Sequence, residues 1–191
     1  SINLSDLLPI YVGIVVIAFG LIALSGYFLG RSYASEYYFK KSQDGISQNN
    51  IKVLYDNQRQ AIIINPYIER DRINFSQTNL LVANNIANKL ASQQDQSQDK
   101  QKNQLSEQDR QTISQAIQAA IAEAKAAAFL NPQKAGNWEN LANIYRNIIN
   151  IAQGSDTWTI SAYQRAIVLD PQNPIYWLNL GGVYYSLKNY D

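Results

Sequence analysis

Two residue types that are common in enzyme and metal sites are missing from this chain of 191 residues. Without cysteine there is no disulfide, no thiolate nucleophile and no cysteine-bound metal. The absence of cysteine also gives no indication of whether the protein resides in an oxidising or a reducing compartment. Without histidine the chain lacks the commonest general base and metal ligand. We therefore expect no catalytic residue, no metal and no cofactor, and we look for a binding function.

An excess of charge is also missing. The net charge of +1, from 16 basic and 15 acidic residues, gives no attraction to nucleic acid, and no nucleic-acid partner is expected. No glycine-rich phosphate loop and no nucleophile elbow occurs, so this segment is not predicted to be an enzyme. Surface or loop positions are expected for the scattered carboxylates Asp44, Asp56, Glu69, Asp71, Glu107 and Asp109. Glu69 and Asp71 form a mixed-sign patch with Arg59, Arg70 and Arg72, which predicts surface salt bridges rather than a phosphate site.

One long apolar run stands at the start of the chain. From Leu7 to Leu29 there is no charged residue, and a helix of this length, at about 1.5 Å per residue, crosses a hydrocarbon core of roughly 30 Å. A cleaved signal peptide fits less well, because Asp6 precedes the run and no lysine or arginine does. A buried core helix would need a larger surrounding core than the rest of the chain supplies. We predict a transmembrane helix with a short flank in residues 1–30, in contact with a lipid bilayer.

Basic residues follow this run. Arg31, Lys40 and Lys41 come after it and none precedes it, so the positive-inside rule places the downstream chain in the cytoplasm. Further spans upstream would override the rule and allow an extracytoplasmic side. Gly26-x-x-x-Gly30 has the spacing that lets helices pack closely in lipid, although glycine is common in spans in any case.

A pattern of large and small residues recurs in the second half of the chain. Trp177, Leu180 and Tyr184 are spaced by three and four, which places them on one helical face. Gly181 within the pattern is expected to let a second backbone approach closely. Trp177 stands six residues after Pro171, and the pattern recurs six after Pro132 as Trp138, Leu141, Ala142 and Tyr145.

A second pattern marks where helices end. At three places an alanine stands five residues before a proline, and an aliphatic residue stands two before it. Small alanines suit close helix crossings, and proline ends a helix because the residue before it leaves the α region. The sets are Ala61/Ile64/Pro66, Ala127/Leu130/Pro132 and Ala166/Leu169/Pro171. Earlier in the same expected helices, seven and three residues before each alanine, stand Leu54 and Gln58, Ala120 and Ala124, and Thr159 and Tyr163. The first unit is degenerate, with Tyr38 and Lys41 where an aromatic residue and a leucine are expected.

Together the two patterns resemble the tetratricopeptide repeat (TPR) in a membrane-anchored bacterial form. The resemblance implies an all-α fold, in which the transmembrane helix is followed by a TPR-like α-solenoid of helix-turn-helix repeats in residues 31–191. The approximate units are 33–66, 67–132, 133–171 and an incomplete 172–191, so we expect the sequence to be part of a longer protein. The expected membrane is the bacterial inner membrane.

The proline spacings exceed the period of an uninterrupted array. They are 66 and 39 residues, against 34 in such an array. We assign the larger excess to a disordered insertion at 92–105, because Ser92–Gln104 contains no apolar side chain. Ser106 and Asp109 then predict a helix N-cap. The smaller excess is assigned to a turn-rich cluster at Gln153–Thr157.

The function that the TPR resemblance implies is binding. In that family the first helices line a concave groove that holds an extended peptide or a partner helix. The alternative for each groove position is a solvated residue or one that covers the next repeat. Glu139 stands where the carboxylate clamp of TPR cochaperones needs a basic residue, so chaperone C-terminal tails are not expected ligands. The groove positions are Glu139, Asn143, Arg146 and Asn147 in one unit, and Leu178, Gly182, Tyr185 and Ser186 in the next.

Two hypotheses for the function follow. The first is a membrane-anchored TPR scaffold that recruits a protein partner. The second is the C-terminal TPR region of a larger polytopic enzyme, because the last apolar helix, Arg31 and the run Ala61–Tyr67 resemble O-antigen polymerase or ligase-like membrane glycosyltransferases of surface polysaccharide assembly. This alternative predicts many spans upstream of Ser1 and places no catalytic residue in the present sequence.

Overall fold

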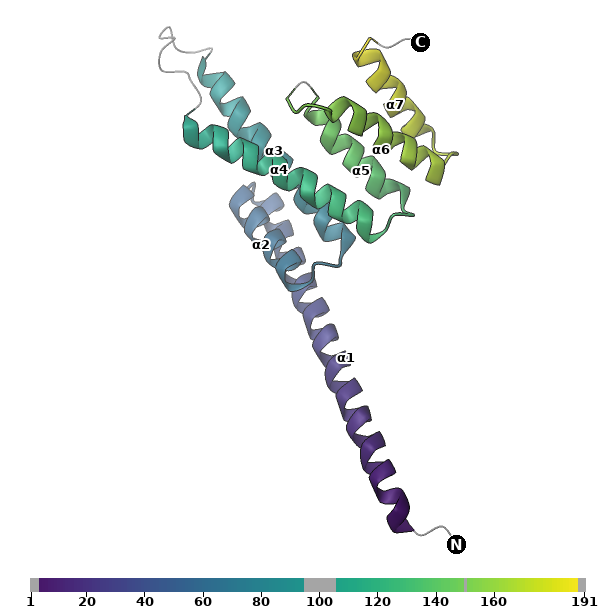
Figure 1. Ribbon diagram of the computed structural model, residues 1–191. Coiled ribbons are helices and arrows are strands. Elements are labelled where there is room, and N and C mark those ends of the chain that lie inside the picture. Colours follow the sequence, from purple (N-terminus) through teal and green to yellow (C-terminus); the bar gives the residue numbers. More distant parts are fainter. Residues whose placement is uncertain (1–3, 95–105, 150, 189–191) are drawn as a thin grey trace.

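The chain folds as a stack of helices on a long helical stalk (Figure 1). The computed structural model describes residues 4–94, 106–149 and 151–188. Within these ranges the regular secondary structure is entirely helical, as the sequence predicts. The helices are α1 (Leu4–Ser47), α2 (Ile51–Ile64), α3 (Glu69–Gln94), α4 (Glu107–Leu130), α5 (Ala135–Asn147), α6 (Ser155–Leu169) and α7 (Pro174–Ser186).

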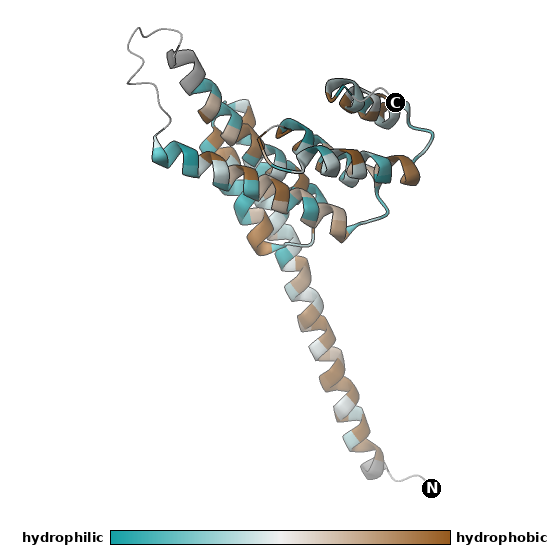
Figure 2. Ribbon diagram, turned by 45° about the horizontal axis from the view of Figure 1, so that its top comes forward, coloured by the Kyte–Doolittle hydropathy of each residue, from teal (hydrophilic) through white to brown (hydrophobic). Residues whose placement is uncertain are grey.

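Helix α1 is 44 residues long, and its first part projects away from all the other helices (Figure 1). Figure 2 shows this part as hydrophobic along most of its length, whereas the other helices alternate between polar and apolar residues. Large apolar side chains from Leu8 to Leu29 are exposed, and the helix is long and apolar enough to cross a membrane. The helix continues unbroken past residue 30, the predicted domain boundary.

The last part of α1 forms an antiparallel hairpin with α2. The closest backbone approach is at Gly45, where an added Cβ would lie 2.4 Å from the backbone nitrogen of Leu54. At the other end of the hairpin, the Arg31 side chain donates through Nε to the carbonyl of Ile64 at 2.7 Å. Ser35 donates through Oγ to the carbonyl of Ala61 at 2.9 Å. The bond from Arg31 satisfies a carbonyl group that the end of α2 would otherwise leave without a partner, and Ser35 adds a second donor to the carbonyl of Ala61.

Helices α3 and α4 form a second hairpin that extends beyond the first (Figure 1). The two helices have 26 and 24 residues, so long helices account for much of the large spacing between Pro66 and Pro132. Helix α3 includes residues 92–94, which the sequence assigns to a disordered insertion; the rest of that insertion lies outside the described residues. The predicted N-cap is confirmed, because the Ser106 hydroxyl accepts a bond of 3.0 Å from the backbone N–H of Asp109.

Helices α5 and α6 form the third hairpin, and α7 packs against α6. The turn between α5 and α6 comes earlier than Gln153–Thr157, the predicted position, because α6 already begins at Ser155. The Ser155 hydroxyl explains this start, since it donates at 3.1 Å to the carbonyl of Ile148, where α5 ends. Gly154 precedes it with φ of +75°, a conformation that glycine adopts without steric cost.

The three second helices α2, α4 and α6 end in the same way, which confirms the alanine and proline pattern. In each, the residue before the proline donates its backbone N–H to the carbonyl of the alanine five before the proline. That alanine is fully buried in all three helices. The bonds are Asn65 to Ala61 at 2.9 Å, Asn131 to Ala127 at 3.3 Å and Asp170 to Ala166 at 2.9 Å.

The tryptophan pattern has an equally direct explanation. The indole N–H of Trp138 donates to the carbonyl of Pro132 at 2.9 Å, and that of Trp177 donates to Pro171 at 3.0 Å. A tryptophan six residues after the proline can therefore form a hydrogen bond across the connection between one repeat and the next. The expectation for Gly181 was wrong, because a Cβ there would meet no atom within 4 Å. In the described chain, no helix packs on that side of α7.

Candidate functional site

The predicted groove residues of α5 lie on one face of the helix. Glu139, Asn143, Arg146 and Asn147 are spaced by four, three and one, which keeps them within one helical stripe. Glu139 and Asn143 are half-buried, while Arg146 and Asn147 are exposed. The opposite face of α5 joins the hydrophobic core through Leu141, Ile144, Tyr145 and Ile148.

A buried tyrosine of α6 forms a hydrogen bond with one residue of this stripe. Tyr163 is fully buried, and its hydroxyl donates to Oδ1 of Asn143 at 2.6 Å. Burial raises the pKa of Tyr163; the charge of Arg146 lowers it in part, and Glu139 raises it further. The phenol therefore keeps its proton at neutral pH and continues to donate. This bond fixes the Asn143 side chain on the groove face.

The charge of Glu139 on α5 affects a residue of α7. Burial raises the pKa of Glu139, and the nearby charge of Arg146 offsets part of that effect. Burial also raises the pKa of Tyr176 on α7, and the charge of Glu139 adds to the rise. The negative charge of Glu139 thus contributes to the electrostatic environment of Tyr176. Glu139 is half-buried, while Arg146 and Asn147 are exposed to solvent.

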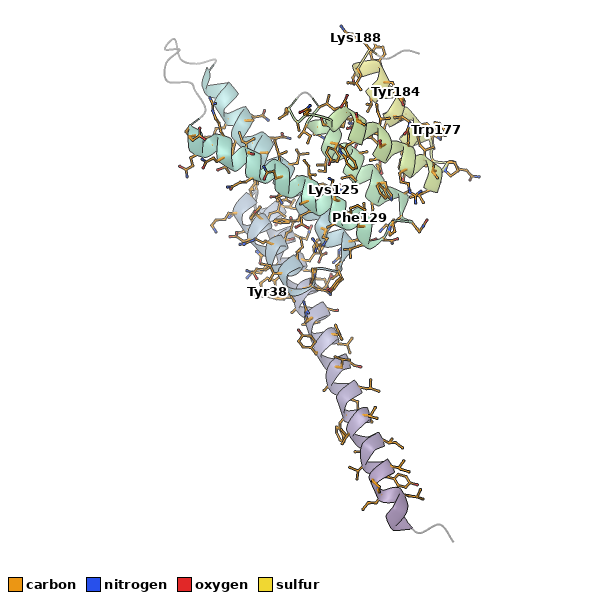
Figure 3. All side chains as sticks on the ribbon, viewed as in Figure 1. Tyr38, Lys125, Phe129, Trp177, Tyr184 and Lys188 are labelled. Atoms are coloured by element: carbon orange, nitrogen blue, oxygen red, sulfur yellow. The ribbon has the colours of Figure 1, made fainter. Side chains whose placement is uncertain are left out.

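The predicted residues of α7 form a second, more apolar stripe. Leu178, Gly182, Tyr185 and Ser186 are all exposed, and Leu178 and Tyr185 are 75% and 73% exposed. Figure 3 labels Trp177 and Tyr184, the pattern residues beside this stripe, on α7. The structure therefore places the α5 set together on one helix and the α7 set together on another.

Sequence reasoning missed that α3 belongs to the same series of first helices. Arg72 stands six residues after Pro66 and donates through Nε to the carbonyl of that proline at 2.7 Å. An arginine here makes the bond that Trp138 and Trp177 make in the later units. The signal was available in the spacing, but arginine and tryptophan share no chemistry except an N–H donor at the end of a long side chain.

This equivalence extends the groove face to α3. Ile73 and Gln77 stand seven and eleven residues after Pro66, as Glu139 and Asn143 do after Pro132. The Nε2 of Gln77 donates to Oδ1 of Asn140 at 2.9 Å, which joins α3 to α5. A polar contact beside the predicted groove positions therefore joins the first helices of two neighbouring units.

The charged residues of the predicted patch pair mostly with residues outside it. Within the patch Arg70 pairs with Asp71, whereas Arg72 pairs with Glu123 and Glu69 pairs with Lys134. Burial alone would raise the pKa of Glu69, but hydrogen bonds from Lys134 and Asn137 together lower it. Asp71 was expected at the surface but is fully buried, in hydrogen-bond contact with Ser35.

Two hollows lie away from the groove face, on either side of α4. One, of about 490 Å³, is lined by α2, α3 and α4 and includes Tyr55 and Val82. The other, of about 380 Å³, lies between α4 and the turn after α5 and includes Ile117 and Ile151. Neither contains a predicted groove residue. Over the part of the chain that the structure describes, no cluster of three or more potential metal-ligating side chains occurs.

Comparisons with known proteins agree with this geometry. A family model described as TPR repeat matches residues 151–188, which include α6 and α7. No curated protein matches the chain. Similar solved structures include the first TPR of Spaghetti (RPAP3) bound to the HSP90 peptide SRMEEVD. It is 11% identical, with a TM-score of 0.56, and the match covers 82% of this chain and 95% of that one.

Two further solved structures have the same fold. The TPR domain of Arabidopsis OM64 is 12% identical, with a TM-score of 0.54 and coverage of 80% of this chain and 96% of that one. The TPR protein TTC0263 of Thermus thermophilus is 13% identical, with a TM-score of 0.55 and coverage of 91% and 80%. At these identities the likeness concerns the fold, which is a TPR-like helical solenoid preceded by one long apolar helix.

Proposed function

We propose that this chain is a membrane-anchored TPR scaffold that binds an extended segment of a partner protein on the face formed by α3, α5 and α7. The observation that carries the proposal is the stripe of Glu139, Asn143, Arg146 and Asn147, with Asn143 held in place by buried Tyr163. The TPR-like fold supports it, because one similar TPR domain is bound to a peptide.

The chemistry of the face indicates the kind of segment it fits. Amide and charged side chains on α5 can donate to and accept from the main chain of an extended peptide. Leu178 and Tyr185 on α7 offer exposed apolar surface for one or two hydrophobic side chains of the ligand. Glu139 adds a negative charge, which disfavours a terminal carboxylate at that point. We therefore expect an internal segment of the partner rather than its C-terminus.

The apolar part of α1 supplies the anchor in this proposal. Its large apolar side chains from Leu8 to Leu29 are exposed, and a lipid bilayer would remove them from water. The proposed location is the bacterial inner membrane, with the repeats on the cytoplasmic side that Arg31, Lys40 and Lys41 indicate. Gly26 and Gly30 have open space around them, which would admit a second helix in the bilayer.

The test compares the proteins that are captured from membranes by the full chain and by two double variants. Asn143→Ala with Arg146→Glu changes the groove face and is expected to lose the specific partner. Gln60→Ala with Arg59→Glu makes similar chemical changes at exposed positions of α2 and should keep it. If the groove variant captures the same partner as the unaltered chain, the groove hypothesis fails.

A further inference from the structure

The last turns of α2, α4 and α6 all expose a large apolar side chain at the same position relative to the following proline. Ile63, Phe129 and Val168 stand three residues before their prolines and are 57%, 71% and 69% exposed. The residue just before each of them is buried, so the helix face toward the core is already filled. A single exposed apolar residue needs no explanation. Three at equivalent positions form a row along the solenoid.

This row lies on the side of the solenoid from which the apolar part of α1 leaves. The bond from Arg31 to the Ile64 carbonyl places the end of α2 level with residue 31. The ion pair between Lys134 and Glu69 holds the starts of α3 and α5 side by side. We call the side formed by the connections 65–68, 131–134 and 170–173 the proline edge (Figure 1).

A contact between α6 and the start of α5 places the end of α6 on the same side of the solenoid as the other connections of the proline edge. The guanidinium of Arg165, in the last half of α6, lies over the ring of Trp138 at the start of α5, 5.9 Å from the centroid. Figure 3 shows Phe129 near the end of α4, on the side of the repeats nearer to α1. The exposed apolar row therefore follows the edge that would face a membrane crossed by α1.

The lengths place the near end of this edge at the bilayer surface. The apolar run from Leu7 to Leu29 spans about 34 Å at about 1.5 Å per residue, against a hydrocarbon core of about 30 Å. Ser32 is three residues further on, or about 5 Å, within the headgroup layer of about 5–8 Å. The Nδ2 of Asn65 donates to the Ser32 hydroxyl at 3.4 Å, so the α2 to α3 connection lies at this depth.

The side chains at that level are suited to an interface. Tyr33 and Tyr67 are 79% and 74% exposed, and tyrosine is favoured where water meets lipid. Arg70, beside Tyr67, is paired with Glu36 at 2.6 Å, and Lys134 is paired with Glu69. Because Arg70 and Lys134 already have carboxylate partners, we expect contact between this edge and lipid to depend more on apolar insertion than on attraction to anionic headgroups.

We propose that the proline edge rests on the bilayer, with Ile63, Tyr67, Phe129 and Val168 inserted at the boundary between headgroups and acyl chains. This inference depends on the proposed membrane anchor. The solenoid then lies along the membrane surface, and the opposite edge, with Ile151 in the turn between α5 and α6, faces away from it.

Since the chain has no cysteine, a single introduced cysteine can be labelled at one chosen position without a competing thiol. Ile63→Cys, Phe129→Cys and Val168→Cys, each carrying an environment-sensitive fluorophore, are compared in the full chain reconstituted into vesicles. Ile151→Cys is the matched control, an apolar residue that is 70% exposed on the far edge. Ile17→Cys marks the anchor. Lipids with a quencher near the headgroup should quench positions 63, 129 and 168 several-fold more than 151, and most strongly at 63.

The outcomes separate the two proposals. If position 17 is quenched by lipid while 63 and 129 respond only to a water-soluble quencher, the anchor stands and the edge inference is overturned. If position 17 also responds only to the soluble quencher, the anchor itself fails. If 63 and 129 are shielded from both quenchers, a protein covers the edge and the lipid assignment is wrong. Phosphatidylcholine vesicles with and without phosphatidylglycerol should give equal quenching.

Discussion

The first and third helical hairpins have the same backbone arrangement but different interiors. Eight residues before its proline, α2 buries Gln58, whereas α6 buries Tyr163 at the equivalent position. The buried side chains of α1 and α2 include the polar residues Ser35, Ser42 and Gln58, whereas the core cluster that contains Tyr163 is mostly aliphatic or aromatic. One repeat geometry is thus maintained by hydrogen bonds near the stalk and by apolar packing further away.

This difference predicts different stabilities. The Oε1 of Gln58 in α2 and the Oδ1 of Asn137 in α5 are each buried without a hydrogen-bond partner, so the cost of about 1–3 kcal/mol for such an atom falls on both hairpins. The difference lies in the apolar packing, because Tyr163 belongs to the hydrophobic core cluster and also donates to Asn143. In a repeat array, each unit interacts mainly with its neighbours, so the two ends can unfold separately. We expect the third hairpin to be the more stable one.

The largest effect is expected for Leu141→Ala in the third hairpin. Leu141 is 2% exposed, and removing a buried leucine side chain costs about 2–5 kcal/mol. All three tryptophans lie at positions 138, 158 and 177, so their fluorescence in detergent micelles reports the unfolding of this region. Leu81→Ala, at an exposed leucine of α3, is the control and should change stability by less than about 0.5 kcal/mol. Equal effects of the two variants would contradict the packing described for α5.

A smaller effect, confined to the first hairpin, is expected for Gly45→Ala. The added Cβ would meet the backbone of Leu54 at 2.4 Å, which requires α1 and α2 to separate and costs about 1–3 kcal/mol. Hydrogen exchange measured by mass spectrometry should show faster exchange in α2, while tryptophan fluorescence changes little. Gly181→Ala is the matched control in α7, where the new methyl group meets nothing and should stabilise the helix by up to about 1 kcal/mol. Loss of the tryptophan transition in Gly45→Ala would show that the hairpins unfold together.

The smallest effect concerns pH. Burial raises the pKa of Asp71, although the hydrogen bond and charge of Arg70 and the bond from Ser35 act in the opposite direction. A carboxyl whose pKa is higher in the folded state binds its proton more tightly there. Its stabilising contribution is therefore complete below the unfolded pKa of about 3.9 and is lost as the pH rises through the folded value.

Asp71→Asn removes this titration. The variant should be more stable than the unaltered chain by about 1 kcal/mol at pH 7, and the gain should disappear as the pH falls toward about 3.9. Asn137 stands at the equivalent position, five residues after its proline, so an amide occurs at this place in another repeat. Urea unfolding followed by circular dichroism at several pH values measures the difference, with Asp44→Asn as the exposed control. A variant that is less stable at pH 7 would show that the charge of Asp71 is needed.

Much of the fold was predictable because the repeat pattern records contacts directly. The alanine and proline spacing marks a backbone hydrogen bond that recurs three times, and the tryptophan and proline spacing marks a side-chain bond that recurs twice. Ser106 was recognisable as a cap for the same reason. These features are local, so a single stretch of sequence contains both partners.

The features that were missed depend on context. Arg72 makes the tryptophan bond with a different side chain, and Gly45 permits a close approach to α2 that its neighbours in sequence do not reveal. The burial of Asp71 follows from the packing of three helices. The roles of Glu139, Arg146 and Tyr185 in binding stay predictions, as do the enzyme alternative and the packing role of Gly26 and Gly30.

The uninterrupted course of α1 has a consequence for geometry. Each residue of an α-helix advances the chain by 1.5 Å and turns it by about 100°. Because no loop separates Leu29 from Arg31, the angular phase of the repeats around the helix axis is set by the residue count alone. One residue inserted there would swing the whole solenoid through more than a quarter of a circle while moving it outward by less than the width of an atom. The length of the junction thus fixes the direction around the α1 axis in which the predicted groove face points.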